Sequence, residues 1–147
     1  MDTNSRSLAK GMTWRVLATA DTILLAYIFT GDVSDAFAIG ALEVVTKTIL
    51  YYFHERLWLH LPVKFPFFWT EEAPEDVMHH RVSFVKAVSW RFFGALDTMI
   101  LAFLVTGDVA ASASIGGVEV FTKVFLYYTH ERMWRRISWG REGTIRS

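Results

Sequence analysis

The chain has 147 residues, of which 52% are hydrophobic and 16% aromatic, and its 15 Lys and Arg balance its 15 Asp and Glu. This length suits a single domain, and the absence of cysteine excludes a disulfide scaffold, a thiolate metal site and a cysteine nucleophile. Because proteins that bind nucleic acid carry a clustered basic excess, the zero net charge predicts no nucleic-acid partner.

The first predicted elements are two apolar segments, at about 10–29 and 36–58, which flank the turn Thr30-Gly31-Asp32. Neither segment shows the alternation of a strand, and both are too long for one. Gly31 suits the residue after a helix, and Asp32 or Ser34 can cap the next helix. So short a link between two helices predicts an antiparallel hairpin.

The same unit then returns 76 residues later without a gap. Between Ser7 and Trp58, 25 of 52 positions are identical to their partners in the second unit. We therefore divide the chain into a first two-helix repeat at 1–58, a linker at 59–82 and a second two-helix repeat at 83–147, which ends in a basic tail. Within the linker, residues 61–69 are expected to lie at an interface, and Pro74 with the acids that follow it is expected to start the next helix.

The charged residues within the apolar segments leave two interpretations open, a membrane protein and a soluble four-helix bundle. Asp21, Glu43 and Lys47 interrupt the apolar segments, and each would cost about 2.5–3.5 kcal/mol at the centre of a bilayer. A soluble bundle is therefore the alternative to a membrane protein. However, Lys47 and Lys123 are the only basic residues in the middle of a segment, and the other 13 lie at the termini or around the linker. This pattern predicts membrane spans with both termini and the linker in the cytoplasm.

Comparison of the two repeats supports the membrane interpretation. On the second helix eight positions that are unchanged between the repeats share one face: Ile39, Gly40, Glu43, Lys47, Leu50, Tyr51, His54 and Trp58. The opposite face changes between the repeats yet stays almost wholly apolar, as expected of a surface in contact with lipid, and consists of Ala41, Leu42, Val45, Thr48, Ile49 and Phe53. The predicted fold is all-α and integral to the membrane, with four transmembrane helices. They form two parallel-repeat hairpins that are related by a pseudo-twofold axis along the membrane normal.

Ionisable residues inside a predicted span are candidates for function. The candidates are Arg15, Asp21, Glu43, Lys47 and His54 in the first repeat and Arg91, Asp97, Glu119, Lys123 and His130 in the second. Glu43 and Lys47 are four residues apart, so Lys47 is expected to bridge Glu43 and Asp21. These charges sum to zero in each unit, which suits a structural network. The alternative is a polar pathway for a proton, a cation or a small anion along the pseudo-twofold axis.

Histidines and small residues each allow two interpretations. His54 is expected either at the cytoplasmic mouth of a pathway or in a hydrogen bond to a neighbouring helix. Trp58 stands where a metalloprotease helix needs its second histidine, and His79 and His80 lack convincing ligand partners, so no metal is expected. Ala36 with Gly40, and Ser112 with Gly116, have the spacing that allows close helix packing, either within a hairpin or in a dimer.

Several motifs together resemble a known family. They are Lys-x3-Trp-Arg at Lys10, an Asp-Thr pair, Thr-Gly-Asp, Glu-x3-Lys and Tyr-Tyr-x-His-Glu-Arg-x-Trp, each present twice. In this combination the chain resembles the bacterial predicted membrane protein family of unknown function DUF2061. The resemblance implies an integral membrane protein with no established activity, and we expect a multi-pass protein of the bacterial inner (plasma) membrane. The family has single-unit members, so a duplicated chain is expected to act as a fused pair.

The sequence thus predicts a small channel-like or transporter-like protein, with the lipid bilayer, a small ion or anion and further copies of itself as partners. The alternative is a structural or accessory subunit of a larger membrane complex, whose buried charges specify only helix packing and oligomerisation. We expect no enzymatic activity, no catalytic residue and no cofactor.

Overall fold

The computed structural model describes residues 3–60 and 75–140, and every regular element in this part of the chain is a helix. The helices are α1 (Asn4–Thr30), α2 (Val33–His60), α3 (Glu75–Thr106) and α4 (Val109–Arg136). Helix α1 begins before the predicted Lys10 because Thr3 caps it, its hydroxyl accepting a hydrogen bond from the backbone N–H of Arg6 at 3.3 Å. The predicted interfacial segment 61–69 lies outside the described residues.

Both hairpin turns have the predicted geometry. Gly31 and Gly107 have φ values of 70° and 69°, in the left-handed region that glycine adopts without strain. The N–H of Gly31 donates to the carbonyl of Tyr27 at 2.8 Å. At the start of the following helices, Asp32 accepts a hydrogen bond from a backbone N–H at 3.0 Å and Asp108 accepts two, at 2.8 and 3.0 Å. The turn residues therefore end one helix and begin the next in each repeat.

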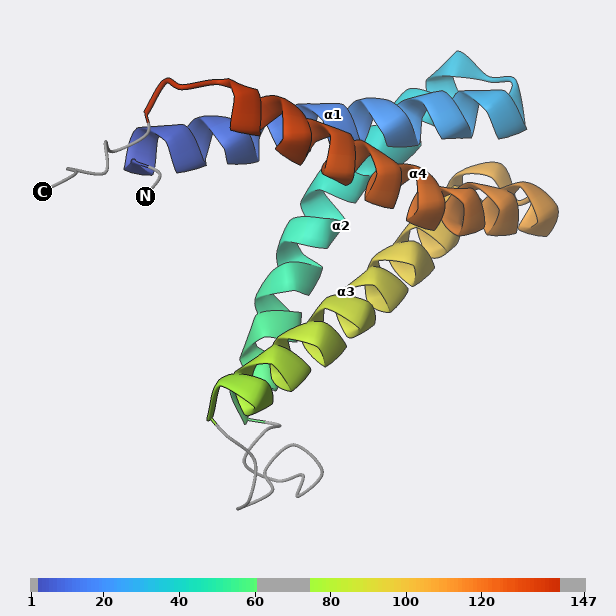
Figure 1. The fold of residues 1–147 in the computed structure, drawn as a ribbon. Coiled ribbons are helices and arrows are strands. Elements are labelled where there is room, and N and C mark those ends of the chain that lie inside the picture. The colour runs from blue at the N-terminus through green and yellow to red at the C-terminus, as the bar shows by residue number, and fades with distance from the viewer. Residues whose placement is uncertain (1–2, 61–74, 141–147) are drawn as a thin grey trace, which may run out of the picture.

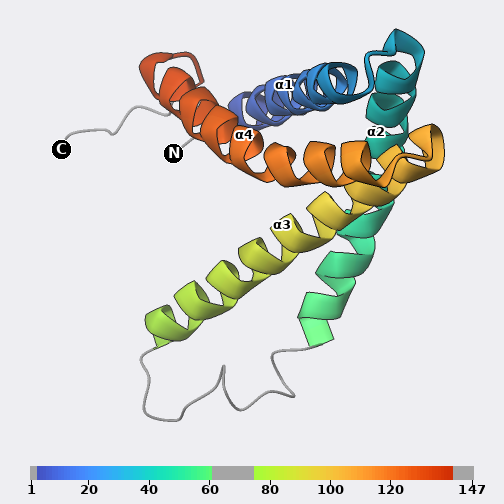
Figure 2. The same ribbon diagram turned by 90° about the vertical axis from the view of Figure 1, so that its right-hand side faces the viewer.

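The helices pair both within and between the hairpins. Within the hairpins α1 packs on α2 and α3 on α4, and between them α1 packs on α4 and α2 on α3. Figure 1 shows that α1 and α4 form one arm and that α2 and α3 form another. The arms join at the hairpin turns and diverge away from them, as the rotated view in Figure 2 also shows. Each arm therefore contains one helix from each repeat.

A small apolar core closes the end of the molecule near the turns. Gly40 and Gly116 allow the close approach of helices there, because an added Cβ would lie 2.4 Å from Cγ1 of Ile23 and 2.3 Å from Cγ of Met99. Each contact is inside one hairpin, which confirms the hairpin-packing alternative for the small residues. The buried residues of this core are Leu25, Ala26, Ala36, Ile39, Ala102 and Ile115.

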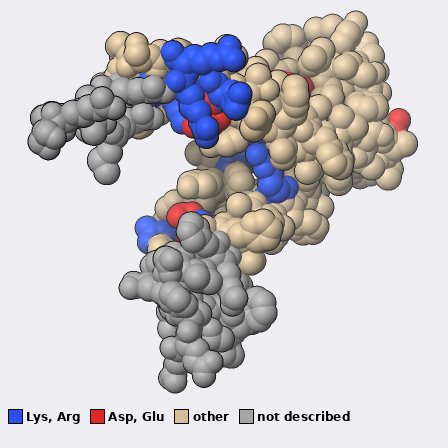
Figure 3. All heavy atoms as spheres, in the orientation of Figure 1, with Lys and Arg blue, Asp and Glu red and all other residues tan. Residues whose placement is uncertain are grey.

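The outer surface is apolar where the comparison of the repeats predicts lipid. On the changing face of α2 every predicted residue is exposed, including Val45 at 58% and Phe53 at 63%. All four helices contain an apolar stretch long enough to cross a membrane. On the face seen in Figure 3, basic atoms lie towards the free ends of the arms and in the hollow between them. An exposed apolar surface of this extent does not fit the soluble-bundle alternative.

Candidate functional site

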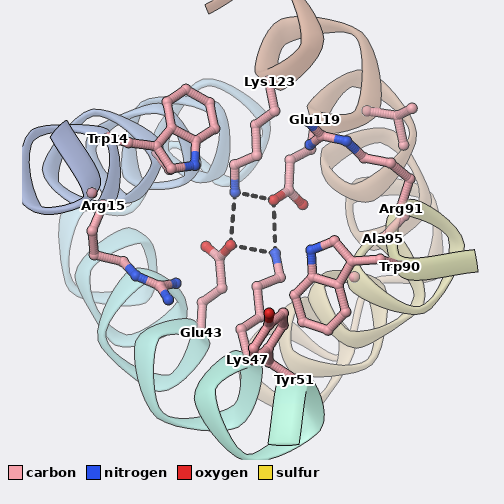
Figure 4. Close-up of a pocket in the computed structure, with 14 residues that line it drawn as sticks. Trp14, Arg15, Glu43, Lys47, Tyr51, Trp90, Arg91, Ala95, Glu119 and Lys123 are labelled. Atoms are coloured by element: carbon pink, nitrogen blue, oxygen red, sulfur yellow. Dashed lines mark hydrogen bonds and ion pairs between the residues drawn. The ribbon is translucent and has the colours of Figure 1, made fainter. Parts of the chain in front are cut away.

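Four buried charges form a closed ring where the two repeats meet. Glu43 and Lys47 come from α2, and Glu119 and Lys123 come from α4. Lys47 Nζ lies 2.9 Å from Oε1 of Glu119, and Lys123 Nζ lies 2.7 Å from Oε1 of Glu43. Each lysine also contacts the glutamate four residues before it on its own helix. Figure 4 shows the resulting square of two ammonium groups and two carboxylates.

Two threonines complete the coordination of the lysines. Lys47 Nζ donates to the hydroxyl of Thr98 at 2.9 Å, and Lys123 Nζ donates to that of Thr22 at 2.8 Å. Each ammonium group therefore has three acceptors for its three protons. The threonines belong to the Asp-Thr pairs of the repeat, and both are fully buried. Neither threonine is among the predicted site residues, although the Asp-Thr motif contains both.

The lysines pair across the repeats, which corrects the predicted bridge from Lys47 to Asp21. Asp21 instead accepts a hydrogen bond from the hydroxyl of Thr122 at 2.9 Å, and Asp97 accepts one from Thr46 at 2.9 Å. The physical reason is that α1 packs on α4 of the other repeat as well as on α2. The identical faces of α2 and α4 meet at the axis, so each lysine meets the glutamate of the other repeat.

A cavity of about 370 Å³ adjoins the ring and lies between the repeats. Most of its lining consists of residues that the repeat relates in pairs. These pairs are Trp14 with Trp90, Arg15 with Arg91, Ala18 with Gly94, Glu43 with Glu119 and Lys47 with Lys123. Figure 3 shows basic atoms in the hollow between the arms, and Figure 4 shows the side chains that surround it.

Arg15 and Arg91 differ from the lysines in having no carboxylate partner. Within the described part of the chain, no acidic oxygen lies within ion-pair distance of either guanidinium group. Asp21 and Asp97 do not line the cavity. The charges of each repeat, which were expected to form one neutral network, are therefore separated in the structure. The glutamate and the lysine join the shared ring, the aspartate accepts from a threonine of the other repeat, and the arginine lies on the cavity wall.

Aromatic side chains from the opposite repeat hold the cavity tryptophans in place. The rings of Trp14 and Tyr127 meet edge to face with centroids 5.0 Å apart, and those of Trp90 and Tyr51 do so at 5.3 Å. In Figure 4 the indole nitrogens of both tryptophans point inward, towards the ring of charges. Among the described residues neither indole N–H has an acceptor. These aromatic pairs join α1 to α4 and α3 to α2.

The predicted site histidines, His54 and His130, lie further along the arms and do not line the cavity. The Nε2 atom of His54 lies 2.8 Å from the hydroxyl of Ser89 and accepts a hydrogen bond from the indole N–H of Trp58 at 3.1 Å. His130 has the equivalent contacts, with Thr13 at 2.9 Å and Trp134 at 3.0 Å. Both histidines therefore connect the two helices of an arm, which matches the predicted alternative of a hydrogen bond to a neighbouring helix.

Further polar contacts close the free ends of the arms. Lys10 pairs with Glu131 at 2.7 Å, and the repeat-related Lys86 pairs with Glu55 at 2.6 Å. Arg6 is 2% exposed and donates to the backbone carbonyls of residues 134, 137 and 139 at the end of α4. Arg6 is not among the predicted site residues because it precedes Ser7, where the comparison of the two repeats begins.

The arrangement holds buried charge in a closed network. Among residues 3–60 and 75–140 no three His, Asp or Glu side chains form a group that could hold a metal ion. The carboxylates of Glu43 and Glu119 are engaged by lysines, and their second oxygens, Oε2 of each residue, accept no hydrogen bond from a described residue. The site is thus a charge network next to a cavity whose walls carry hydrogen-bond donors.

Comparison with known proteins identifies the repeated unit. The family model described as predicted membrane protein DUF2061 matches residues 8–59 and again residues 84–135. The two matched segments have the offset of the internal repeat and together cover more than half of the chain. No curated protein and no solved structure matches the chain.

Proposed function

The chain belongs to the DUF2061 family of predicted membrane proteins, with the family unit present twice, and from this premise we propose that it conducts a small ion or solute across the membrane. In this proposal the path runs along the pseudo-twofold axis between the repeats. The ring of Glu43, Lys47, Glu119 and Lys123 acts as its gate. The protein is a channel-like or transporter-like protein and not an enzyme.

One observation carries the proposal: a cavity lined by repeat-related charged residues ends at the ring. On the side of the turns, the apolar core that contains Ile39 and Ile115 lies beyond the ring. The cavity, the ring and this core thus follow one another along the axis. A conduction path that is open on one side and closed by a gate would show this order of cavity, ring and core. Ionisable residues inside the membrane often mark ion pathways in transport proteins.

A specific observation also favours the alternative, a structural or accessory subunit. Every ammonium proton of Lys47 and Lys123 has an acceptor, so the ring is a complete network that can fix helix register without conducting anything. Buried charges that set register are a known use of ion pairs. Under this alternative the protein is a subunit of a larger membrane complex, and no ion or solute passes through the cavity.

The proposal also covers the orientation of the protein in the membrane, the membrane in which it lies and its oligomeric state. We place the protein in the bacterial inner membrane with both termini in the cytoplasm, because the basic residues concentrate at the free ends of the arms. The cavity then opens to the cytoplasm. We further propose a homo-oligomer, because the two arms diverge and the four helices of one chain leave the hollow between them open to lipid.

Flux through liposomes tests conduction. Purified protein is reconstituted and assayed for proton, potassium, chloride and sulfate movement. We expect flux for at least one ion, and we expect Glu43→Gln/Glu119→Gln to raise anion flux at least tenfold. The reason is that Lys47 and Lys123 lose their carboxylate partners and repel each other. The matched control is Glu55→Gln/Glu131→Gln, which removes two repeat-related carboxylates outside the cavity and should conduct as the wild type does.

Two results would decide against conduction. If wild-type protein moves none of the four ions while Glu43→Gln/Glu119→Gln dissociates or unfolds, the ring is structural and the accessory role stands. If flux appears but the ring variant and the control variant behave alike, the path does not pass the ring.

A further inference from the structure

The cavity wall carries four donor groups that have no acceptor among the described residues. They are the guanidinium groups of Arg15 and Arg91 and the indole N–H groups of Trp14 and Trp90. Arginine and tryptophan side chains donate hydrogen bonds and cannot accept them. A ligand that satisfies all four must therefore be rich in acceptors.

The charge of the lining has the sign that suits such a ligand. Glu43 and Glu119 are each paired with both lysines, so the ring is neutral. Arg15 and Arg91 then leave the lining with an excess of two positive charges. This excess disfavours a cation and favours an anion at the level of the arginines.

Both arginines are accessible from the cavity, since Arg15 is exposed and Arg91 is half-buried on its wall. At about 1.5 Å per residue, Arg15 lies about 22 Å along α1 from Thr30. The hydrocarbon core is about 30 Å thick, so Arg15 lies inside it or at its inner boundary. By contrast, Lys10 and Lys86 pair with glutamates, and Arg56 and Arg132 lie over tyrosine rings at 5.2 and 5.9 Å. A bound anion would supply the acceptors that the two arginines lack among the described residues.

We propose that Arg15 and Arg91 bind small oxyanions in the cavity between the repeats, with Trp14 and Trp90 as further donors. This inference rests on the proposed function, since it names the class of the conducted species, but it is tested by binding alone. The planar fork of a guanidinium group matches two oxygens of a phosphate, sulfate or carboxylate. The same chemistry is presented by a free anion in the cavity and by the phosphate of a lipid headgroup.

Calorimetry with inorganic sulfate and inorganic phosphate tests the free anion. The full chain is placed in nanodiscs of zwitterionic lipid at constant ionic strength. We expect saturable binding that Arg15→Gln/Arg91→Gln weakens at least tenfold. The control is Arg56→Gln/Arg132→Gln, which also removes two repeat-related positive charges but lies outside the cavity, and its dissociation constant should stay within twofold of the wild type.

Native mass spectrometry of nanodiscs that contain phosphatidylglycerol tests the headgroup. If the lipid is the source of the phosphate, the wild type and the control variant retain it and Arg15→Gln/Arg91→Gln loses it. Competition by inorganic sulfate shows that the two ligands share the site. Absence of both saturable free-anion binding and retained anionic lipid in the wild type overturns the proposal, as does equal binding by the two arginine variants.

Tryptophan fluorescence provides a second test of anion binding, which is needed if Arg15→Gln/Arg91→Gln does not fold. In the wild type we expect sulfate or phosphate to shift the emission saturably, with the shift lost in Trp14→Phe/Trp90→Phe and kept in Trp139→Phe. Loss of the shift in Trp139→Phe alone places the ligand elsewhere and overturns the site. Anion binding without flux refutes conduction and leaves the site, whereas cation flux without anion binding refutes the site and leaves conduction.

Discussion

At Lys47 and Lys123 every proton of a buried ammonium group has an acceptor, and this completeness makes the ring sensitive to the loss of any member. A buried charge is tolerated when its partners are in place, and removal of one partner leaves the other charge uncompensated. The ring and its two threonines should therefore respond as one unit to substitution. Pairwise ion-pair energies would not describe it.

Substitution at Lys47 tests this coupling. We expect Lys47→Met to lower the free energy of unfolding by about 3–5 kcal/mol, because it leaves an excess of carboxylate in the ring. The double variant Lys47→Met/Glu119→Met leaves the neutral pair of Glu43 and Lys123 and should lose clearly less than the sum of the two single variants. Steric trapping in bicelles measures each free energy.

The control for this cycle is Lys86→Met, which breaks a half-exposed ion pair with Glu55 at the end of an arm. Exposed ion pairs contribute about 0–1 kcal/mol, so the loss should stay in that range. Additive losses at Lys47 and Glu119 would contradict a coupled ring.

The sequence predicts the contacts of the ring within one helix, but not its contacts between helices, which depend on the geometry of helix packing. The spacing of four residues places Glu43 beside Lys47 on any helix. The partner of Lys47 on another helix depends on how α2 and α4 cross, which no spacing within one repeat encodes. Arg6 shows a second limit, because its buried contacts are with backbone carbonyls at the far end of the chain. Backbone acceptors leave no trace in side-chain patterns.

Among the elements, the helix crossing inside each hairpin depends on one glycine. At Gly116 a Cβ would meet Cγ of Met99 at 2.3 Å and the backbone oxygen of Ala95 at 3.0 Å. At Gly40 it would meet the branched side chain of Ile23 at 2.4 Å. The backbone oxygen of Ala95 cannot move away without shifting a helix, and the β-branched Ile23 has little rotamer freedom, so the crossing and the position of the ring depend on the two glycines.

Alanine substitutions test the crossing. We expect Gly40→Ala and Gly116→Ala each to lower the free energy of unfolding by about 1–3 kcal/mol, as overpacking does. Gly117→Ala is the matched control, since no atom lies within 4 Å of the added Cβ. It should leave stability unchanged or raise it by up to about 1 kcal/mol through helix propensity. Equal effects at Gly116 and Gly117 would contradict the close packing.

The helices themselves are well predicted because their determinants are local. Turn residues such as Gly31 and Asp108 fix where helices end and begin, and the length of each apolar segment excludes strands. The changing face of α2 is predicted from the repeat comparison and is exposed. The divergence of the arms is not predicted, because it follows from contacts between α1 and α4 and between α2 and α3, which are distant in sequence.

For the whole molecule, duplication of the unit produces a site that one copy does not contain. Each repeat supplies half of the ring, one arginine and one tryptophan to the cavity. Because each arm combines helices from both repeats, movement of the arms relative to each other would change the ring and the cavity together. This linkage is the physical basis for treating the ring as a gate.

The central claim is that ions pass through the cavity between the repeats, and a single cysteine in its lining tests this most directly. The chain has no cysteine of its own, so Ala18→Cys is the only reactive thiol in that variant. The matched control is Ala41→Cys, on the exposed face of α2. A charged, membrane-impermeant thiosulfonate is applied to the cytoplasmic side of liposomes that show flux. We predict that it abolishes flux through Ala18→Cys and leaves flux through Ala41→Cys unchanged, whereas full labelling of Ala18→Cys with undiminished flux would contradict the account.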